Sequence, residues 1–211
     1  MGKQPVETTL YSLSEQLPAR QAERREGERH MTLFRVGALL LDGRRELCLI
    51  RNISAGGMML RAYCPLSVGQ QVAIELKNGQ PIAGQVSWMG DQQVGIAFDQ
   101  PIDVVAILAS DDEGPRPRMP RIETDACIFV REGAATWRLT CSDISQGGVK
   151  LTDSGLLTNG ADVVVTLNGM APQPGVVRWT ADGSAGISFN RPLPLSELVS
   201  WLQAQRGARA A

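Results

Sequence analysis

The chain has 211 residues, of which 43% are apolar, 20% charged and 5% aromatic. This apolar content is sufficient for packed cores and excludes a chain that is disordered throughout, and no apolar run approaches the roughly 18 residues that cross a bilayer. Lys and Arg together number 21 against 22 Asp and Glu, a formal net charge of −1, so the overall field attracts neither duplex nucleic acid nor an anionic membrane.

The chain begins with a polar segment. Residues 7–29 are rich in Glu and Arg and compatible with a helix, and we expect them to form an arm. Residues 1–19 precede the first domain, and the rest of the arm belongs to it. No apolar secretory segment precedes or overlaps the arm, so we expect a cytoplasmic protein.

Short apolar runs bounded by Gly, Pro, Asn or Asp follow the arm, a pattern typical of strands and not of helices. We expect strands over 33–41, 46–53, 57–62, 71–77, 82–89 and 92–98, and a short helical pattern over 101–108. Six short strands at this spacing favour a small closed barrel.

The chain also contains an internal repeat. Residues 52–101 align without gaps to residues 143–192, an offset of 91, and 18 of the 50 positions are identical. Each copy is too long for a solenoid repeat and long enough to enclose its own core. We therefore expect two domains of one fold, over 20–110 and 111–211.

The boundary is expected near 111–115, where acidic residues, Gly and Pro cluster. In the second copy we expect strands over 125–131, 136–144, 148–152, 162–167, 174–180 and 185–189. A helix should follow, because Leu195, Leu198, Val199 and Leu202 recur at helical spacing. Its apolar face could cover its own barrel, a neighbouring domain or another subunit, and the oligomeric state stays open.

No motif for catalysis or metal binding is present. His30 is the single histidine, and the sequence contains no GxSxG, HExxH, Walker or GxGxxG pattern. Cys48, Cys64, Cys127 and Cys141 form no CxxC pair, so we expect free thiols, no metal and no cofactor. We predict a protein that is not an enzyme.

Arginines precede a polar interruption between two apolar strands. Arg24, Arg25 and Arg29 lie in the arm, and Asn52 and Ser54 begin the interruption, which contains two glycines. Guanidinium groups bind phosphate bidentately and stack on purines, so an arginine-bearing arm could close over a nucleotide. The simpler interpretation is that the arginines are solvated or paired with neighbouring Glu, and that the polar residues form a turn.

These residues resemble the PilZ domain. The signature of that family is RxxxR followed by (D/N)xSxxG, and this chain has Arg25-Glu-Gly-Glu-Arg29 and then, 23 residues later, Asn52-Ile-Ser54-Ala-Gly-Gly57. Trp88 and the strand around Val94–Phe98 are also similar to the family's C-terminal half. The resemblance covers about 20–110 and again about 116–206.

The resemblance implies a six-stranded antiparallel barrel that binds the bacterial second messenger cyclic di-GMP without catalysis. It implies that Arg25 and Arg29, with Arg24 adjacent, contact phosphate and guanine. Asn52, Ser54 and Gly57 would hold the guanine from the barrel wall. A downstream protein partner is also implied but not identified.

The second copy departs from the signature in its arm. Asp143, Ser145 and Gly148 of (D/N)xSxxG are intact. If Arg121 takes the position of the second arginine, 22 residues before Asp143, the first position is Pro117; at the offset of 91, Arg116 instead matches Arg25 and Pro120 matches Arg29. One position is a proline in either alignment. Pro has no charge and a fixed φ. We expect a weakened second site, whose candidate residues are Arg116, Arg118, Arg121, Asp143, Ser145 and Gly148.

Two functions of different classes therefore remain. The first is a cyclic di-GMP receptor in which ligand changes the arrangement of the arm and the domains. The alternative is a nucleotide-independent adaptor for protein partners. Binding of single-stranded nucleic acid is disfavoured, because it requires aromatic platforms in a basic groove and the chain has only four Phe, four Trp and two Tyr.

Overall fold

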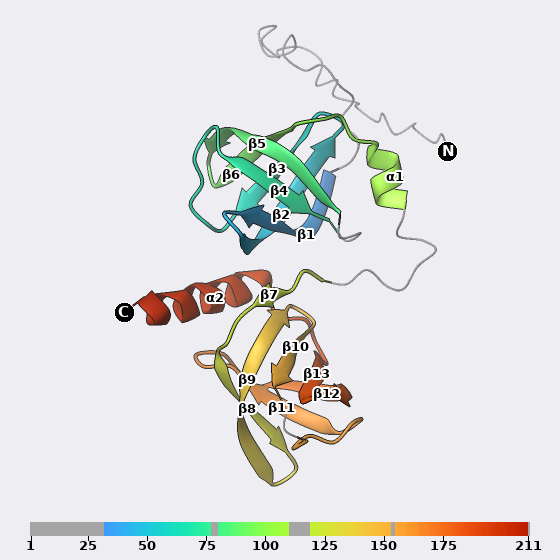
Figure 1. Ribbon diagram of the computed structural model, residues 1–211, viewed down its shortest axis with the longest axis vertical. Helices are drawn as coiled ribbons and strands as arrows, with labels where there is room; N and C mark the ends of the chain where they lie inside the picture. Colours follow the sequence, from blue (N-terminus) through green and yellow to red (C-terminus); the bar gives the residue numbers. More distant parts are fainter. Residues whose placement is uncertain (1–31, 77–79, 110–118, 153–154, 211) are drawn as a thin grey trace, which may run out of the picture.

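The computed structural model describes residues 32–76, 80–109, 119–152 and 155–210. Two β-barrels follow one another along the chain, each with a helix after it (Figure 1). This arrangement confirms the predicted fold class, two tandem six-stranded antiparallel barrels. The expected arm and the expected boundary near 111–115 lie outside the described residues. No helix within the described ranges is long and apolar enough to cross a membrane.

The first barrel has the strand order β1-β2-β3-β6-β5-β4 and closes through pairing of β1 with β4. Asp42 and Gly43, with φ of 49° and 72°, form the two-residue loop between β1 and β2, where a hairpin requires positive φ. Closure leaves no free sheet edge. The elements are β1 (Thr32–Leu41), β2 (Arg44–Ser54), β3 (Gly57–Ala62), β4 (Gln71–Glu75), β5 (Pro81–Gly90), β6 (Gln93–Phe98) and α1 (Val104–Ala109).

The second barrel repeats this topology in the order β8-β9-β10-β13-β12-β11, closed by pairing of β11 with β8. One difference is the two-residue strand β7, which precedes the strand predicted over 125–131 and was not itself predicted; the predicted strand is β8. In β7, Glu123 lies opposite Asp143, as Thr32 lies opposite Asn52 in the first barrel. The elements are β7 (Ile122–Glu123), β8 (Cys127–Glu132), β9 (Ala135–Ser145), β10 (Gly148–Thr152), β11 (Asp162–Thr166), β12 (Gln173–Ala181), β13 (Ser184–Phe189) and α2 (Leu195–Ala210).

Each barrel encloses an apolar core of its own, built by the period of two along its strands. Val72 and Ile74 of β4 are buried in the first core, and Val163 and Val165 of β11 are buried in the second. Two separate cores in one chain agree with the internal repeat.

The helix α2 belongs to the core of the second barrel and also reaches the first barrel. Leu198, Trp201 and Leu202 are almost fully buried in the second core, which confirms the predicted apolar face. Figure 1 shows α2 lying between the two barrels. The sequence left open whether α2 covers its own barrel, a neighbouring domain or another subunit. In the structure α2 contacts both its own barrel and the neighbouring one.

Two side chains of α2 make polar contacts with the first barrel, and an apolar residue of the first barrel packs into the second core. The Gln203 side-chain amide donates to the Tyr63 carbonyl at 2.8 Å, and Arg206 forms an ion pair with Glu46. Leu47, at 3% exposure, belongs to the second barrel's core cluster although it lies in β2. Its neighbour along the strand faces the first core, so the pleat directs Leu47 outward to the second barrel.

A second contact joins β2 to the segment leading into β7. Arg45 forms an ion pair with Glu75, another residue of the first barrel. The Nη1 atom of Arg45 lies 3.5 Å from the carbonyl oxygen of Arg121. Arg121 immediately precedes β7, so this segment touches both barrels.

All four cysteines are free thiols. Cys48 and Cys141 face the two cores, and burial raises the pKa of each thiol to about 12. Burial also raises the pKa of the half-buried Cys64 thiol to about 11, with a further increase from the negative charge of Glu46. Among the described residues no group of three His, Cys, Asp or Glu side chains could hold a metal ion.

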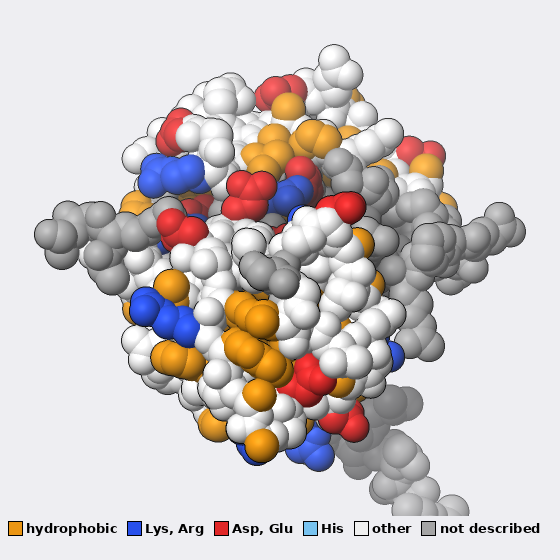
Figure 2. Space-filling view, turned by 60° about the horizontal axis from the view of Figure 1, so that its bottom comes forward, with side chains coloured by type: hydrophobic (Ala, Val, Ile, Leu, Met, Phe, Trp, Pro, Cys, Tyr) orange, Lys and Arg blue, Asp and Glu red, His pale blue; other side chains and the backbone are white. Residues whose placement is uncertain are grey.

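Charged side chains of both signs are interspersed on the face drawn in Figure 2. On that face the described residues form no continuous basic stripe of the kind that follows a nucleic-acid backbone. This agrees with the near-neutral composition of the chain.

Candidate functional site

The serine of each (D/N)xSxxG motif closes the hairpin on which the motif lies. Ser54 Oγ donates to the carbonyl oxygen of Gly57 at 3.0 Å, between β2 and β3. Ser145 Oγ donates to the carbonyl oxygen of Gly148 at 3.3 Å, between β9 and β10. Ser145 is 3% exposed. The hydroxyl thus has a structural task in both barrels.

The motif's last glycine is required by close packing. A Cβ atom on Gly57 would lie 2.4 Å from the carbonyl oxygen of Ile96, and one on Gly148 would lie 2.1 Å from that of Ile187. No larger residue fits without displacing the neighbouring strand. The first residue of the motif, Asn52 or Asp143, is paired across the sheet with Met59 or Lys150.

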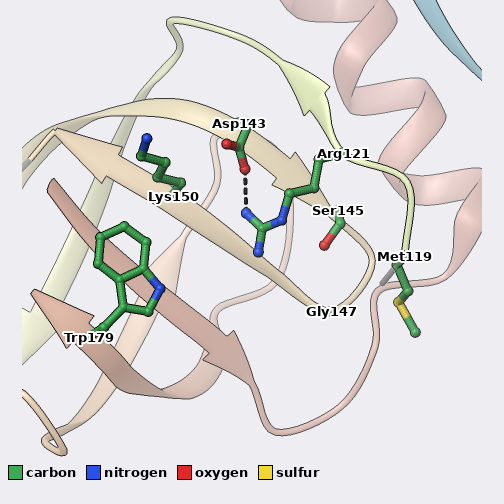
Figure 3. Close-up of a pocket in the computed structure, with 7 residues that line it drawn as sticks. All are labelled: Met119, Arg121, Asp143, Ser145, Gly147, Lys150 and Trp179. Atoms are coloured by element: carbon green, nitrogen blue, oxygen red, sulfur yellow. Dashed lines mark hydrogen bonds and ion pairs between the residues drawn. The ribbon is translucent and has the colours of Figure 1, made fainter. Parts of the chain in front are cut away.

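A pocket opens at this hairpin on the second barrel, with a volume of about 480 Å³. Its residues come from the segment before β7, from the β9–β10 hairpin and from β12 (Figure 3). They are Met119, Arg121, Asp143, Ser145, Gly147, Lys150 and Trp179. Three of the seven are candidate residues of the second site.

Strand pairing places Asp143, Lys150 and Trp179 of the pocket in one row across the sheet. Lys150 in β10 lies opposite Asp143 in β9 on one side and opposite Gly186 in β13 on the other, and Gly186 lies opposite Trp179 in β12. The register shifts just before Trp179. A Cβ atom on Gly186 would lie 2.2 Å from Trp179 Nε1, so the indole lies directly over the glycine.

One acid and two bases give the pocket its charge. Arg121 forms an ion pair with Asp143, and their side chains are 43% and 21% exposed. Figure 3 shows this pair at the centre of the pocket, with Lys150 and Trp179 on the side away from Met119. Because one carboxylate faces a guanidinium and an ammonium, the formal charge of the lining is +1.

The corresponding row of the first barrel has Met59 at the position that Lys150 occupies in the second. Asn52 lies opposite Met59, Met59 opposite Gly95, and Gly95 opposite Trp88. A Cβ atom on Gly95 would lie 2.0 Å from Trp88 Nε1, and the indole is 45% exposed.

Five of the predicted site residues lie outside the part of the chain that the structure describes. They are Arg24, Arg25, Arg29, Arg116 and Arg118. Their roles stay predictions.

The other predicted residues gather at the two hairpins. Arg121, Asp143 and Ser145 line the second pocket, and Gly148 lies beside it.

Four lining residues of the second pocket were missed by the sequence reasoning: Met119, Gly147, Lys150 and Trp179. The repeat contained a signal for two of them, because Trp179 matches Trp88 and Lys150 replaces Met59 at the offset of 91.

Comparisons with known proteins give no significant match among curated proteins. Three solved structures that match are PlzA from Borreliella burgdorferi in complex with c-di-GMP, YcgR from Escherichia coli in complex with c-di-GMP, and the inhibitor of motility MotI/DgrA from Bacillus subtilis. Their sequences are 11%, 16% and 14% identical to this chain, and their TM-scores are 0.35, 0.32 and 0.32. The matches cover 82%, 83% and 85% of this chain and 87%, 86% and 98% of the respective structures.

The family comparison covers most of the chain. The model of the PilZ domain matches twice, over residues 20–109 and 115–204, one match for each barrel. The signature hairpins and the barrel topology described above occur in both matched segments. The chain belongs to the PilZ domain family.

Proposed function

We propose that the protein is a receptor for cyclic di-GMP and acts by binding, not by catalysis. The observation that carries this proposal is the pocket at the β9–β10 hairpin, where Arg121 and Lys150 supply positive charge and Trp179 supplies an aromatic face. Guanidinium and ammonium groups suit phosphates, and an indole suits a purine. Cyclic di-GMP, the ligand implied by the family resemblance, has two of each.

In the first barrel the arm completes the site. The row offers the Asn52 amide and the Trp88 ring, and it has Met59 at the position that Lys150 occupies in the second barrel. We therefore assign phosphate binding to Arg25 and Arg29, with Arg24 adjacent, and guanine contacts to the hairpin of Asn52, Ser54 and Gly57. Closure of the arm would change its arrangement relative to the barrels. We place the receptor in the cytoplasm, with units over 1–19, 20–110 and 111–211.

Titration calorimetry of the full chain with cyclic di-GMP tests this proposal. Arg25→Ala and Arg29→Ala should each weaken binding at the first barrel by roughly tenfold to a hundredfold, because a hydrogen bond to a charged group contributes about 1.5–3 kcal/mol. Arg20→Ala is the matched control, since it removes an arm arginine outside the signature and should leave the affinity unchanged.

Two results would contradict the assignment. Equal affinities of the Arg25→Ala, Arg29→Ala and Arg20→Ala chains would remove the arm from the site. The absence of any binding heat from the unmodified chain would reject the receptor and favour the adaptor, whose partner should be retained after replacement of Asn52 and Ser54.

A further inference from the structure

The outer side of β8 is exposed in the second barrel, together with that of its neighbours β9 and β11. Phe129 of β8 is 50% exposed, and strand pairing places it opposite Arg138 of β9 and Thr166 of β11. Arg131, two residues further along β8, lies on the same side of the strand. We refer to these four residues as the β8 face. In Figure 1 the β8–β9 hairpin lies at the end of the second barrel that is remote from the first barrel.

The first barrel has the same face in the same register, but there it is covered. At the offset of 91 Phe129 matches Ala38 and Arg138 matches Leu47, and Ala38 is paired with Leu47 as Phe129 is paired with Arg138. Ala38 and Leu47 are buried, at 1% and 3% exposure, and Leu47 belongs to the core cluster of the other barrel. The repeat thus contains one covered and one open copy of this face.

A helix lies beside the covered copy. Arg206 of α2 forms an ion pair with Glu46, the residue next to Leu47, and the Gln203 side chain of α2 donates to the Tyr63 carbonyl. The core cluster that includes Leu47 also includes apolar residues of α2. A helix therefore docks at this face by apolar packing and by an ion pair of complementary charge.

The open copy has a different charge. In the first barrel Arg45 is compensated by its ion pair with Glu75, and at the offset of 91 Thr166 takes the place of Glu75. Arg131 and Arg138 of the β8 face form no hydrogen bond or ion pair with another described residue. The face therefore has a formal charge of +2 around an exposed aromatic ring, and a molecule that covers it must supply negative charge.

An acidic protein segment suits this face better than a nucleic acid does. A nucleic-acid strand requires several cations along its path and successive aromatic platforms, whereas the β8 face has two arginines and one ring. Each guanidinium can form two parallel hydrogen bonds with one carboxylate. The Phe129 ring and the aliphatic stems of the arginines form a small apolar surface beside these charges.

We infer that the β8 face docks an acidic helix of a partner protein, whose carboxylates bind Arg131 and Arg138 and whose apolar side chains pack on Phe129. The inference goes beyond the proposed function and does not rest on it, because the β8 face shares no residue with the pocket at the β9–β10 hairpin. It gives the chain a defined surface for a protein partner.

Fluorescence anisotropy of a labelled peptide with the full chain tests the inference. The probe is an amphipathic 16-residue peptide of Leu, Ala and Glu, the length of α2, and its twin has Lys in place of every Glu. The acidic peptide should bind and the basic twin should not. Arg131→Ala and Arg138→Ala should each weaken binding by roughly twofold to fivefold, and Phe129→Ala by roughly fivefold to tenfold. Arg191→Ala removes an exposed arginine between β13 and α2 and should leave the affinity unchanged.

Charge reversal separates a docking role from a structural role. A chain with both Arg131→Glu and Arg138→Glu should bind the basic twin and no longer bind the acidic peptide. Such a gain cannot come from a damaged fold. A preference that the reversal does not change, or a loss in Arg191→Ala as large as that in Arg138→Ala, would overturn the inference.

Two further measurements test the other occupants. Binding of labelled oligothymidine in place of the acidic peptide, abolished by Arg138→Glu, would assign the face to nucleic acid and overturn the inference. A dimer in sedimentation velocity that Arg138→Glu dissociates would assign the face to a second copy of the chain, with the same consequence. Binding of the acidic peptide by a monomeric chain that does not bind oligothymidine supports the inference.

Discussion

At the scale of single residues, the signature hairpin serves the fold before it serves a ligand. Ser54 and Ser145 use their hydroxyls to close the hairpin, and Gly57 and Gly148 allow the next strand to approach. These roles explain why the second copy keeps the serine and the glycine although its arm has changed. An intact (D/N)xSxxG is therefore weaker evidence of binding than the cations around it.

Buried thiols make the stability depend on alkaline pH. The pKa of Cys48 and of Cys141 is about 12 in the folded protein, against 9.0 for an ordinary thiol, so the unfolded chain loses these protons first. Since the native state then binds more protons, stability is fully present below pH 9 and falls as the pH rises from about 9 towards 12. The loss is at most about 1.4 kcal/mol per pH unit for each thiol.

Urea unfolding at pH 8, 9.5 and 10.5 measures this dependence. Cys141→Ala should reduce the slope of unfolding free energy against pH, because one of the linked protons is gone. Cys127→Ala, which removes an exposed thiol, should keep the original slope. Equal slopes in the two variants would contradict the prediction.

At the scale of elements, the strand predictions were confirmed and the exceptions have physical causes. The two-residue β7 was not predicted, because Ile122 and Glu123 are held by pairing with β9 and not by a local pattern. The spacing of Leu198 and Leu202 indicated α2, but periodicity does not state which surface an apolar face meets. Lys150 and Trp179 were missed because only strand register brings them together.

The ribbon of β12 and β13 depends on a glycine. Gly186→Ala would place a Cβ 2.2 Å from Trp179 Nε1 and force the indole off the wall. We expect a loss of about 1–3 kcal/mol in unfolding free energy and a shift in tryptophan emission. Gly90→Ala, where nothing lies within 4 Å of the added atom, should produce neither. An unchanged emission spectrum for Gly186→Ala would exclude the close contact.

At the scale of the whole molecule, the sequence predicted two domains but not how they meet. Leu47 lies in a continuous apolar run with Cys48, so nothing in the sequence marks it as a contact between barrels. The strand pleat turns it away from its own core and α2 arrives from the other end of the chain. Such long-range packing has no local signal.

This contact should couple the unfolding of the barrels. We expect the full chain to unfold in one calorimetric transition, with a ratio of van't Hoff to calorimetric enthalpy near one. Leu47→Ala removes about 2–5 kcal/mol of buried packing at the contact and should lower that ratio. Val68→Ala, at a side chain that is 64% exposed, is the control and should leave the ratio unchanged. A ratio that Leu47→Ala does not alter would show that the barrels are independent.

Arg121 contacts both barrels. Its backbone oxygen faces Arg45 of one barrel while its guanidinium holds Asp143 of the other. A compound whose binding displaces Arg121 also changes the equilibrium of the contact between the barrels. Thermodynamic linkage requires that a change in this contact alters the compound's affinity by the same factor. A crosslink that holds the barrels together would then change the affinity of the pocket at Arg121 without touching the pocket itself.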